Sequence, residues 1–326
     1  MVLTRAAGDD HNAPMNHALL KRCAWQVLLL ALLFPLPAWA WNAAGHRLVA
    51  CIAWDHLADG TREQLSRLLH EHPDYPRWSK RAGEHYPAGD LERAAFIESS
   101  TWPDEIRKDR RFYSAGRDLP TETLAGFPDM ERRSNWHYVA WPLTDAPGTR
   151  REPVAGRIDQ ALVAQPTMLG SADDANRSYA LPWLTHLVGD AHQPLHTSVK
   201  IDAEGRQDRL GTGLTVNNPF AARQPLTTLH AYWDDLPGPG GLRGAALDDD
   251  CRALAAAYPH PAPSAPAQWL DESWQIARRD GYPPGDERVP TISAQFNEKA
   301  REIANRRVAQ AGYRLADLLR ELLGGS

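Results

Sequence analysis

Residues 186–196 have the sequence His-Leu-Val-Gly-Asp-Ala-His-Gln-Pro-Leu-His. Side chains four positions apart share one face of a helix, so His186 and Asp190 can grip one cation together. Pro194 then ends or bends the helix, which leaves His196 free to reach a neighbouring ion. The stretch therefore predicts a helix whose last turns carry metal ligands.

A second stretch, His230-Ala-Tyr-Trp-Asp234, repeats the four-residue spacing between histidine and aspartate. One such pair by itself is usually an ion pair on the surface of a helix. Two pairs, with His196 as a further histidine nearby, favour a metal centre over two unrelated surface pairs.

Three shorter stretches add candidates: Trp41-Asn-Ala-Ala-Gly-His46, Trp102-Pro-Asp-Glu-Ile-Arg107 and Trp136-His-Tyr138. Alone, each is typical of a structural role, because a core histidine, a helix cap or a packed aromatic would explain it. Joined to the two paired motifs, His46, Asp104 and His137 become candidate ligands. Arg107 becomes a candidate for contact with an anionic substrate.

The rest of the chain predicts an all-α, single-domain fold with long loops. Helical periodicity runs through residues 43–57, 61–69, 91–100, 158–167, 172–191, 247–258, 267–279 and 291–323. We expect Thr61 to cap the second helix and the last helix to break near Gly312. Residues 70–89 and 116–134 predict loops, and residues 200–224 predict a hairpin or a surface loop.

The net charge of the chain limits the kinds of partner that it can bind. The 326 residues carry a formal net charge of -5. A protein that binds nucleic acid on a broad basic surface usually has a positive net charge. Any contact with nucleic acid must then be local, and bound divalent metals would add positive charge that the residue count omits.

The first forty residues predict an export signal. Lys21 and Arg22 precede an apolar run, residues 24–33, that is too short to span a bilayer, and Ala38-Trp-Ala40 suits signal peptidase. The alternative, a buried N-terminal helix, lacks an amphipathic pattern. We expect a signal peptide over residues 1–40, a mature domain over 41–326, a periplasmic or secreted monomer and no stable membrane anchor. Cleavage after Ala40 would give Trp41 a free amine that can bind metal with its carbonyl.

Two cysteines, Cys51 and Cys251, remain after removal of the signal. An even pair in an oxidising compartment is consistent with a disulfide. The alternative is a buried thiol at Cys51, which lies in an apolar helical stretch.

Together these stretches, with Gly312-Tyr-Arg-Leu-Ala316, resemble the zinc-dependent single-strand nucleases of moulds and plants, the S-one/P-one type. The wider superfamily includes bacterial zinc phospholipases C. The resemblance covers nearly the whole mature chain and implies a helical phospholipase C/nuclease-like fold. It also implies three zinc ions and nine ligand residues: Trp41, His46, Asp104, His137, His186, Asp190, His196, His230 and Asp234.

The resemblance also implies how the ligands divide. Asp104, His137, His186 and Asp190 would hold one zinc, and His196, His230 and Asp234 a second. Trp41, His46 and the other oxygen of Asp190 would hold a third. Ligand type alone leaves manganese open.

Zinc would neutralise the phosphate and acidify the attacking water, with Asp190 joining two ions and Arg107 balancing the charge that develops on phosphorus oxygens. The implied reaction is cleavage of single-stranded DNA and RNA to 5′-nucleotides, with 3′-nucleotides as further substrates. Aspartate at position 234 favours this branch over the phospholipase branch, where glutamate is usual. The competing hypotheses are a phospholipase C acting on lipid head groups and a zinc-binding protein without activity.

Two features bear on the substrate. Tyr138 occupies the position of an aromatic that stacks on a base in the nucleases; the alternative is a core tyrosine packed behind His137. Ala140 and the segment Leu210-Gly-Thr-Gly213 depart from the family pattern at positions that bind bases.

Histidines outside the motifs should be exposed or in loops, and His192 should be structural. These outside histidines are His56, His70, His72, His85 and His260.

Overall fold

The computed structural model describes residues 41–86, 89–143, 152–285 and 287–324. This part of the chain is mainly helical and lies within one compact unit, Ala38–Ser326. The all-α fold class is therefore confirmed. The signal predicted for residues 1–40 lies outside the described residues.

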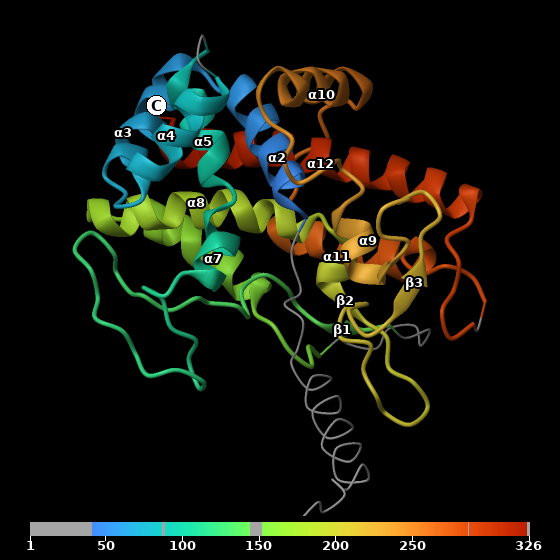
Figure 1. The fold of residues 1–326 in the computed structure, drawn as a ribbon. Coiled ribbons are helices and arrows are strands. Elements are labelled where there is room, and N and C mark those ends of the chain that lie inside the picture. The colour runs from blue at the N-terminus through green and yellow to red at the C-terminus, as the bar shows by residue number, and fades with distance from the viewer. Residues whose placement is uncertain (1–40, 87–88, 144–151, 286, 325–326) are drawn as a thin grey trace, which may run out of the picture. The chain divides into compact units, whose positions relative to one another are not determined.

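Helix α8 (Asp174–Ala191) is the centre of this unit. Every residue from Ser178 to Ala191 is buried, so the helix is enclosed on all sides rather than amphipathic. It packs against α7 (Ile158–Leu169), α12 (Ala294–Leu323), α2 (Ala43–Asp55), α3 (Asp59–His70) and α6 (Trp102–Glu105). Figure 1 shows α8 running through the middle of this unit, with α2 and α12 on one side and α7 on the other.

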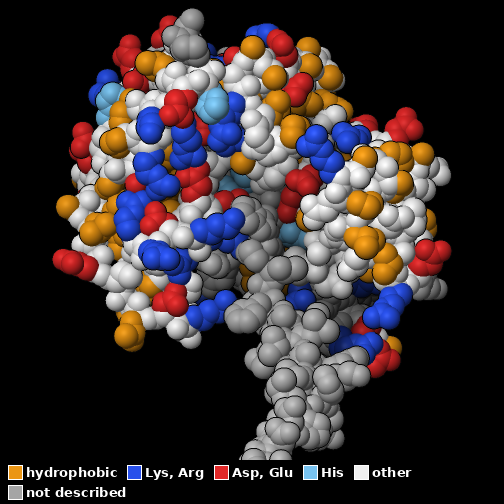
Figure 2. Space-filling view, in the orientation of Figure 1, with side chains coloured by type: hydrophobic (Ala, Val, Ile, Leu, Met, Phe, Trp, Pro, Cys, Tyr) orange, Lys and Arg blue, Asp and Glu red, His pale blue; other side chains and the backbone are white. Residues whose placement is uncertain are grey.

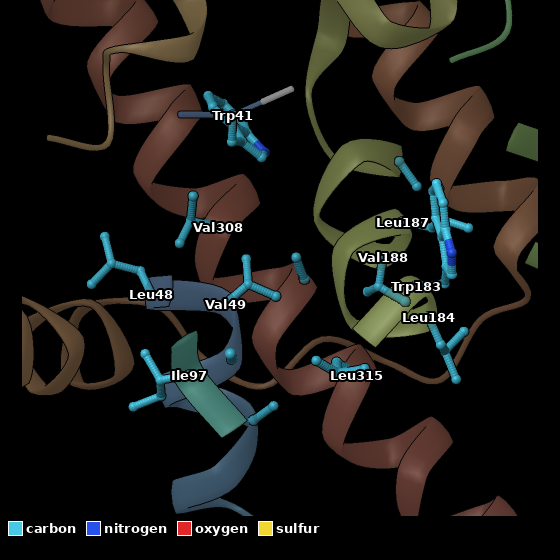
Figure 3. Close-up of a cluster of buried hydrophobic side chains, with 14 of the residues drawn as sticks. Trp41, Leu48, Val49, Ile97, Trp183, Leu184, Leu187, Val188, Val308 and Leu315 are labelled. Atoms are coloured by element: carbon cyan, nitrogen blue, oxygen red, sulfur yellow. The ribbon is translucent and has the colours of Figure 1, made fainter. Parts of the chain in front are cut away.

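The core joins helices that are far apart in the sequence. Figure 3 shows side chains of α2, α8 and α12 meeting with Ile97 of α5 (Leu91–Ser99). Leu48, Leu187 and Val308 are among the side chains in this cluster with no exposed surface. Burying an aliphatic side chain of this size contributes about 1.5–3 kcal/mol, so the cluster anchors the helices that carry the site.

Helix α12 continues through Gly312, so the predicted break is wrong. A Cβ on Gly312 would lie 2.6 Å from the Ile52 side chain and 3.2 Å from the Val49 carbonyl oxygen. The glycine therefore allows α12 to approach α2 closely, and the helix around it stays regular.

Two predictions between residues 58 and 89 are also wrong. Thr61 lies inside α3, which begins at Asp59 after the extended residue Ala58. The predicted loop contains α4 (Tyr75–His85), which has a proline in its first turn and buries Trp78 and Ala82 four positions apart. Two buried side chains are enough to hold α4 in place because the helix packs against α5.

His72 precedes α4 in a turn, as expected of a loop histidine, but it is buried. Its Nδ1 accepts a hydrogen bond from the Asp74 backbone N–H at 3.0 Å, and its ring lies 4.6 Å from that of Trp78. His72 is therefore part of the packing between this turn and α4.

The short strands connect loops beside the end of α8. Strand β1 (Trp141–Pro142) pairs in parallel with β2 (Ser198–Val199), which follows the 3-10 helix η2 (Pro194–Thr197). Strand β3 (Thr215–Asn217) pairs antiparallel with β4 (Leu226–Thr228), so the predicted hairpin is present with its second strand just beyond residue 224. Helix α9 (Leu229–Asp234) follows at once.

The remaining helices lie at the periphery of α2 and α8. Helix α10 (Gly244–Ala257) is joined to α2 by a disulfide between Cys251 and Cys51, which are 200 positions apart. Helix α11 (Pro266–Asp280) contacts η2. Among the described residues, no helix combines the length and apolar character that crossing a membrane requires.

Candidate metal centre

The described residues contain three groups of histidine and aspartate whose ligand atoms lie within 4.8 Å of one another. The groups are His46/Asp104/His186, His137/His186/Asp190 and His196/His230/Asp234. They bring together eight predicted ligand side chains from α2, α6, α8, η2, α9 and the loop before β1. A fourth group, Cys51/Asp55/Cys251, contains the disulfide.

The first cluster forms where α8 meets the loop carrying His137. Oδ2 of Asp190 lies 3.2 Å from Nε2 of His186 and 3.1 Å from Nδ1 of His137. Oδ1 of Asp104 lies 3.9 Å from that His137 nitrogen and 4.0 Å from Nε2 of His186. The two histidine nitrogens are themselves 3.0 Å apart. Such convergence of nitrogen and oxygen atoms suits a shared cation.

Backbone carbonyls set the tautomers of three histidines. Nδ1 of His186 donates to the Ser100 carbonyl at 2.9 Å. In the same way His196 Nδ1 donates to the His137 carbonyl at 2.6 Å, and His230 Nδ1 donates to the Leu210 carbonyl at 2.7 Å. A carbonyl can only accept, so Nδ1 carries the proton and the neutral ring keeps a lone pair on Nε2. The three rings are thereby prepared as metal ligands.

Asp190 also faces a second cluster. Its Oδ1 lies 3.4 Å from Nε2 of His46 and 3.7 Å from Nδ1 of His196. Within the described part of the chain, this oxygen and both ring nitrogens of His46 have no hydrogen-bond partner. The two oxygens of one carboxylate thus point to different sets of histidines, which is the geometry of a bridging ligand.

The third group depends on an unusual backbone. Arg209, Leu210 and Gly211 have φ angles of 51°, 63° and 81°. Residues other than glycine rarely adopt positive φ, and such strain persists only where the surroundings impose it. Here the strained segment delivers the Leu210 carbonyl to His230, whose Nε2 lies 3.4 Å from Oδ2 of Asp234.

Burial alters the acidity of the cluster. It raises the pKa of Asp234 well above its usual range and that of Asp190 to about 7, and it lowers the pKa values of His46 and His137. Neutral histidines are the form that binds metal, and a bound cation offsets the cost of burying carboxylate charge. The donor set and its unpartnered buried atoms fit divalent metal ions.

Arg107 stands beside this cluster on the 3-10 helix η1 (Ile106–Lys108). One guanidinium nitrogen donates to Oδ1 of Asp104 at 3.2 Å, and the side chain retains 14% exposure. Its positive charge also contributes to the lowered pKa of His137, after burial and His186. Arg107 is therefore an arginine beside the candidate ligands whose side chain solvent can reach.

Tyr138 is half-buried and packs against a small apolar cluster of Ala140, Val199 and Leu210. Ala140 and Leu210, which belong to the two departures noted in the sequence, therefore lie together beside Tyr138. Burial raises the pKa of the Tyr138 hydroxyl, although the positive charges of Arg107 and Arg117 oppose the rise. A ring that is partly exposed beside Arg107 is consistent with either role considered for it.

Trp41 is completely buried at the start of the described chain. Asn42 holds this segment: its backbone N–H donates to the Asp234 carbonyl at 3.1 Å and its amide donates to Asp235 at 2.8 Å. Its Oδ1 accepts from the Ala44 N–H at 2.9 Å and caps α2. The segment before His46 is thus fixed against α9.

His192 is structural, as predicted. It donates from Nδ1 to the Val188 carbonyl at 2.7 Å and accepts from Arg314 at 2.9 Å.

Sequence reasoning missed the residues that orient the ligands. They include the carbonyls of Ser100 and Leu210, which carry no side-chain signal, and the amide of Gln193, which donates to Asp234 at 2.7 Å. Gln193 did have a signal, because it lies inside the ligand-bearing stretch.

The molecular surface has a hollow in which histidine side chains are visible (Figure 2). Figure 2 shows histidine atoms at the bottom of a hollow on one face, with lysine and arginine gathered to one side. Arginines of the described chain commonly have acidic partners, as Arg81 has Glu105 and Arg77 has Asp109. Local positive charge therefore coexists with a net negative chain.

Comparison with known proteins agrees with this arrangement. A family model described as S1/P1 Nuclease matches residues 41–324. The chain is 25% identical over 311 residues to Endonuclease 5 of Arabidopsis thaliana, covering 87% of this chain and 91% of the relative. It is 23% identical over 315 residues to Endonuclease 4 of the same plant, covering 87% and 90%.

Proposed function

Because this chain belongs to the S1/P1 nuclease family, a family of hydrolases that act on phosphodiester bonds, we propose that it is a zinc-dependent endonuclease for single-stranded DNA and RNA. The observation that carries the proposal is the set of three histidines whose tautomers are fixed by backbone carbonyls around buried carboxylates. The expected products are 5′-nucleotides, with 3′-nucleotides as further substrates.

The ligands divide between the proposed ions as the family resemblance implies, and the two sides of Asp190 support this division. The first zinc would be held by His137, His186, Asp104 and Oδ2 of Asp190. The second would be held by His196, His230 and Asp234. The third would be held by His46, Oδ1 of Asp190 and the Trp41 main chain. Bound zinc would supply Lewis-acid charge to the phosphate and acidify the attacking water.

The protein's own groups position the substrate around these ions. Arg107 can turn one guanidinium edge toward a phosphate oxygen while Asp104 holds the other, which balances negative charge in the transition state. Tyr138 offers a ring face on which a base can stack without sequence preference. Attack on phosphorus breaks the bond to the 3′ oxygen, which leaves as a 3′-hydroxyl, and the phosphate stays on the 5′ side.

We also propose that residues 1–40 are a signal peptide and that the mature domain, 41–326, acts in the periplasm or outside the cell. The family match begins at residue 41, directly after the predicted cleavage site, which supports this division. An oxidising compartment is also consistent with the Cys51–Cys251 disulfide.

The test of the proposed function is an assay of the mature protein, with and without a chelator, on denatured DNA, RNA and phosphatidylcholine vesicles. We expect cleavage of both nucleic acids, loss of activity with chelator and recovery on adding zinc. Cleavage of the lipid alone would refute the nucleic-acid assignment. Undiminished cleavage after chelation, with no metal left in the protein, would refute the metal requirement.

Replacing Arg107 with alanine should lower kcat/KM on single-stranded DNA by roughly 10²–10³-fold, because a charge that faces the transition state is removed. Arg107→Lys should recover part of the loss, since lysine keeps the charge but not the forked geometry. The matched control is Arg62→Ala, which removes a half-buried arginine paired with Asp59 outside the ligand groups. Zinc content should stay unchanged in all three variants, and equal kcat/KM for Arg107→Ala and the control would contradict the assignment.

A further inference from the structure

We propose that Gln193 is a positioning residue for the ion at His196, His230 and Asp234: its amide holds Oδ1 of Asp234 and thereby commits Oδ2 to the metal. The inference rests on the proposed metal dependence. It adds a residue that is not itself a ligand, and it assigns that residue to one ion of the centre.

The orientation of the Gln193 amide is determined by its two partners. Gln193 has no exposed surface, and its Oε1 accepts a hydrogen bond from the Leu195 backbone N–H at 2.5 Å. A backbone N–H can only donate, so the oxygen must face Leu195. The amide nitrogen therefore faces Asp234, where it donates to Oδ1 at 2.7 Å.

The two oxygens of Asp234 consequently have different surroundings. Oδ1 is held by Gln193, whereas Oδ2 has no hydrogen-bond partner among the described residues and lies 3.4 Å from Nε2 of His230. The carboxylate is almost fully buried, so water cannot readily satisfy Oδ2. An outer partner that fixes one oxygen and leaves the other for the metal is the usual arrangement around a ligating carboxylate.

Gln193 can hold Asp234 because its own backbone is immobilised at the end of α8. Its N–H donates to the Asp190 carbonyl at 3.0 Å. The next two carbonyls are also bound: that of Ala191 accepts from Ser273 Oγ at 2.6 Å and that of His192 accepts from Arg307 Nε at 3.3 Å. These bonds from α11 and α12 close the helix end that would otherwise expose free carbonyls.

The link is also selective. The Gln193 side chain bonds to one predicted ligand, Asp234, and to the Leu195 backbone. His46 and His137 instead lie beside the carboxylate of Asp190, at 3.4 Å and 3.1 Å. Loss of the amide should therefore weaken one ion and leave the other two in place.

The experiment compares Gln193→Met with Gln165→Met in the full mature protein. Methionine keeps the size of glutamine but cannot donate a hydrogen bond. Gln165, on α7, is also fully buried, and neither of its amide atoms has a hydrogen-bond partner in the described part of the chain. It therefore controls for placing methionine at a buried glutamine.

The readouts are zinc stoichiometry, zinc affinity by competition with a chelator, and the melting temperature of the metal-free protein. We expect Gln193→Met to bind one of its ions roughly 10–100-fold more weakly, with the other two unchanged. The Gln165→Met protein should bind all its ions as the unmodified protein does. A merely structural role for Gln193 would lower the melting temperature of the metal-free protein without singling out one ion.

Equal affinity for every ion in Gln193→Met and the unmodified protein would overturn the inference, as would equal weakening of all ions. If Gln193→Met does not fold, Gln193→Glu carries the same test, because it keeps the size and polarity but replaces the donor with a carboxylate. Absence of bound metal in the unmodified protein would instead overturn the proposed function, so the two failures are distinguishable.

Discussion

Replacing Asp190 with asparagine is expected to lower the rate of phosphodiester hydrolysis by roughly 10³-fold and to leave the mature protein short of zinc. The change keeps the size of a side chain that is fully buried near the end of α8. It removes the negative charge, and it replaces one of two oxygens with an NH₂ group that cannot bind a cation. One oxygen of Asp190 faces His137 and His186, and the other faces His46. Either orientation of the asparagine therefore deprives one cluster of its shared ligand.

The measurements are initial rates on denatured DNA and zinc content by elemental analysis. The matched control is Asp280→Asn at the end of α11, since Asp280 is a buried carboxylate paired with Lys299 and Arg279 outside the ligand groups. We expect the control to keep its zinc and its rate even if it is less stable. An Asp190→Asn protein with full activity and unchanged zinc would show that Asp190 does not bridge two ions.

The ligand pairs could be predicted from sequence because a helix fixes which side chains share a face. His186 with Asp190 and His230 with Asp234 lie four apart on α8 and α9, and their contacts follow from that spacing alone. Local patterns thus predicted the helix over residues 172–191 and the pairing of histidine with aspartate on α8 and α9.

The orienting groups could not be predicted because they are products of tertiary structure. The Leu210 carbonyl reaches His230 across twenty positions, through a backbone with positive φ at two residues that are not glycine. No local preference indicates such a conformation, since it is imposed by the surroundings. The choice between a disulfide and a free thiol at Cys51 stayed open for a similar reason, because its partner lies on α10, 200 positions away.

Helix predictions failed where packing outweighs composition. Gly312 is a poor helix former by itself, yet it lies in a regular helix because only a residue without Cβ fits against Ile52. Helix α4 buries only Trp78 and Ala82, too few positions to show a period in a short segment with Pro76 and Gly83. In both places the neighbouring helix, α2 or α5, decides the local structure.

A protein that keeps one residue before Trp41 is expected to bind one zinc fewer than the protein cut after Ala40, and to be roughly 10²-fold less active. An amide nitrogen formed with a preceding residue has no lone pair to offer a metal, whereas a free α-amine near its pKa of about 8 does. The surroundings are prepared for such a ligand. Trp41 is buried, Asn42 fixes the segment to the Asp234 carbonyl, and both ring nitrogens of His46 lack hydrogen-bond partners among the described residues.

The experiment uses two proteins with N-termini verified by mass spectrometry, one beginning at Trp41 and one at Ala40, and compares their zinc content and rates. A third protein, beginning at Trp41 and carrying the extra alanine after Ser326, controls for the added residue. Because the Ala40 variant leaves every ligand side chain in place, a deficit of one ion would assign that ion to the liberated amine. It would also mean that processing completes the centre, so the uncut chain would be roughly 10²-fold less active than the processed protein. Equal zinc content and equal rates in all three proteins would show that His46 and Asp190 hold their ion without the N-terminus.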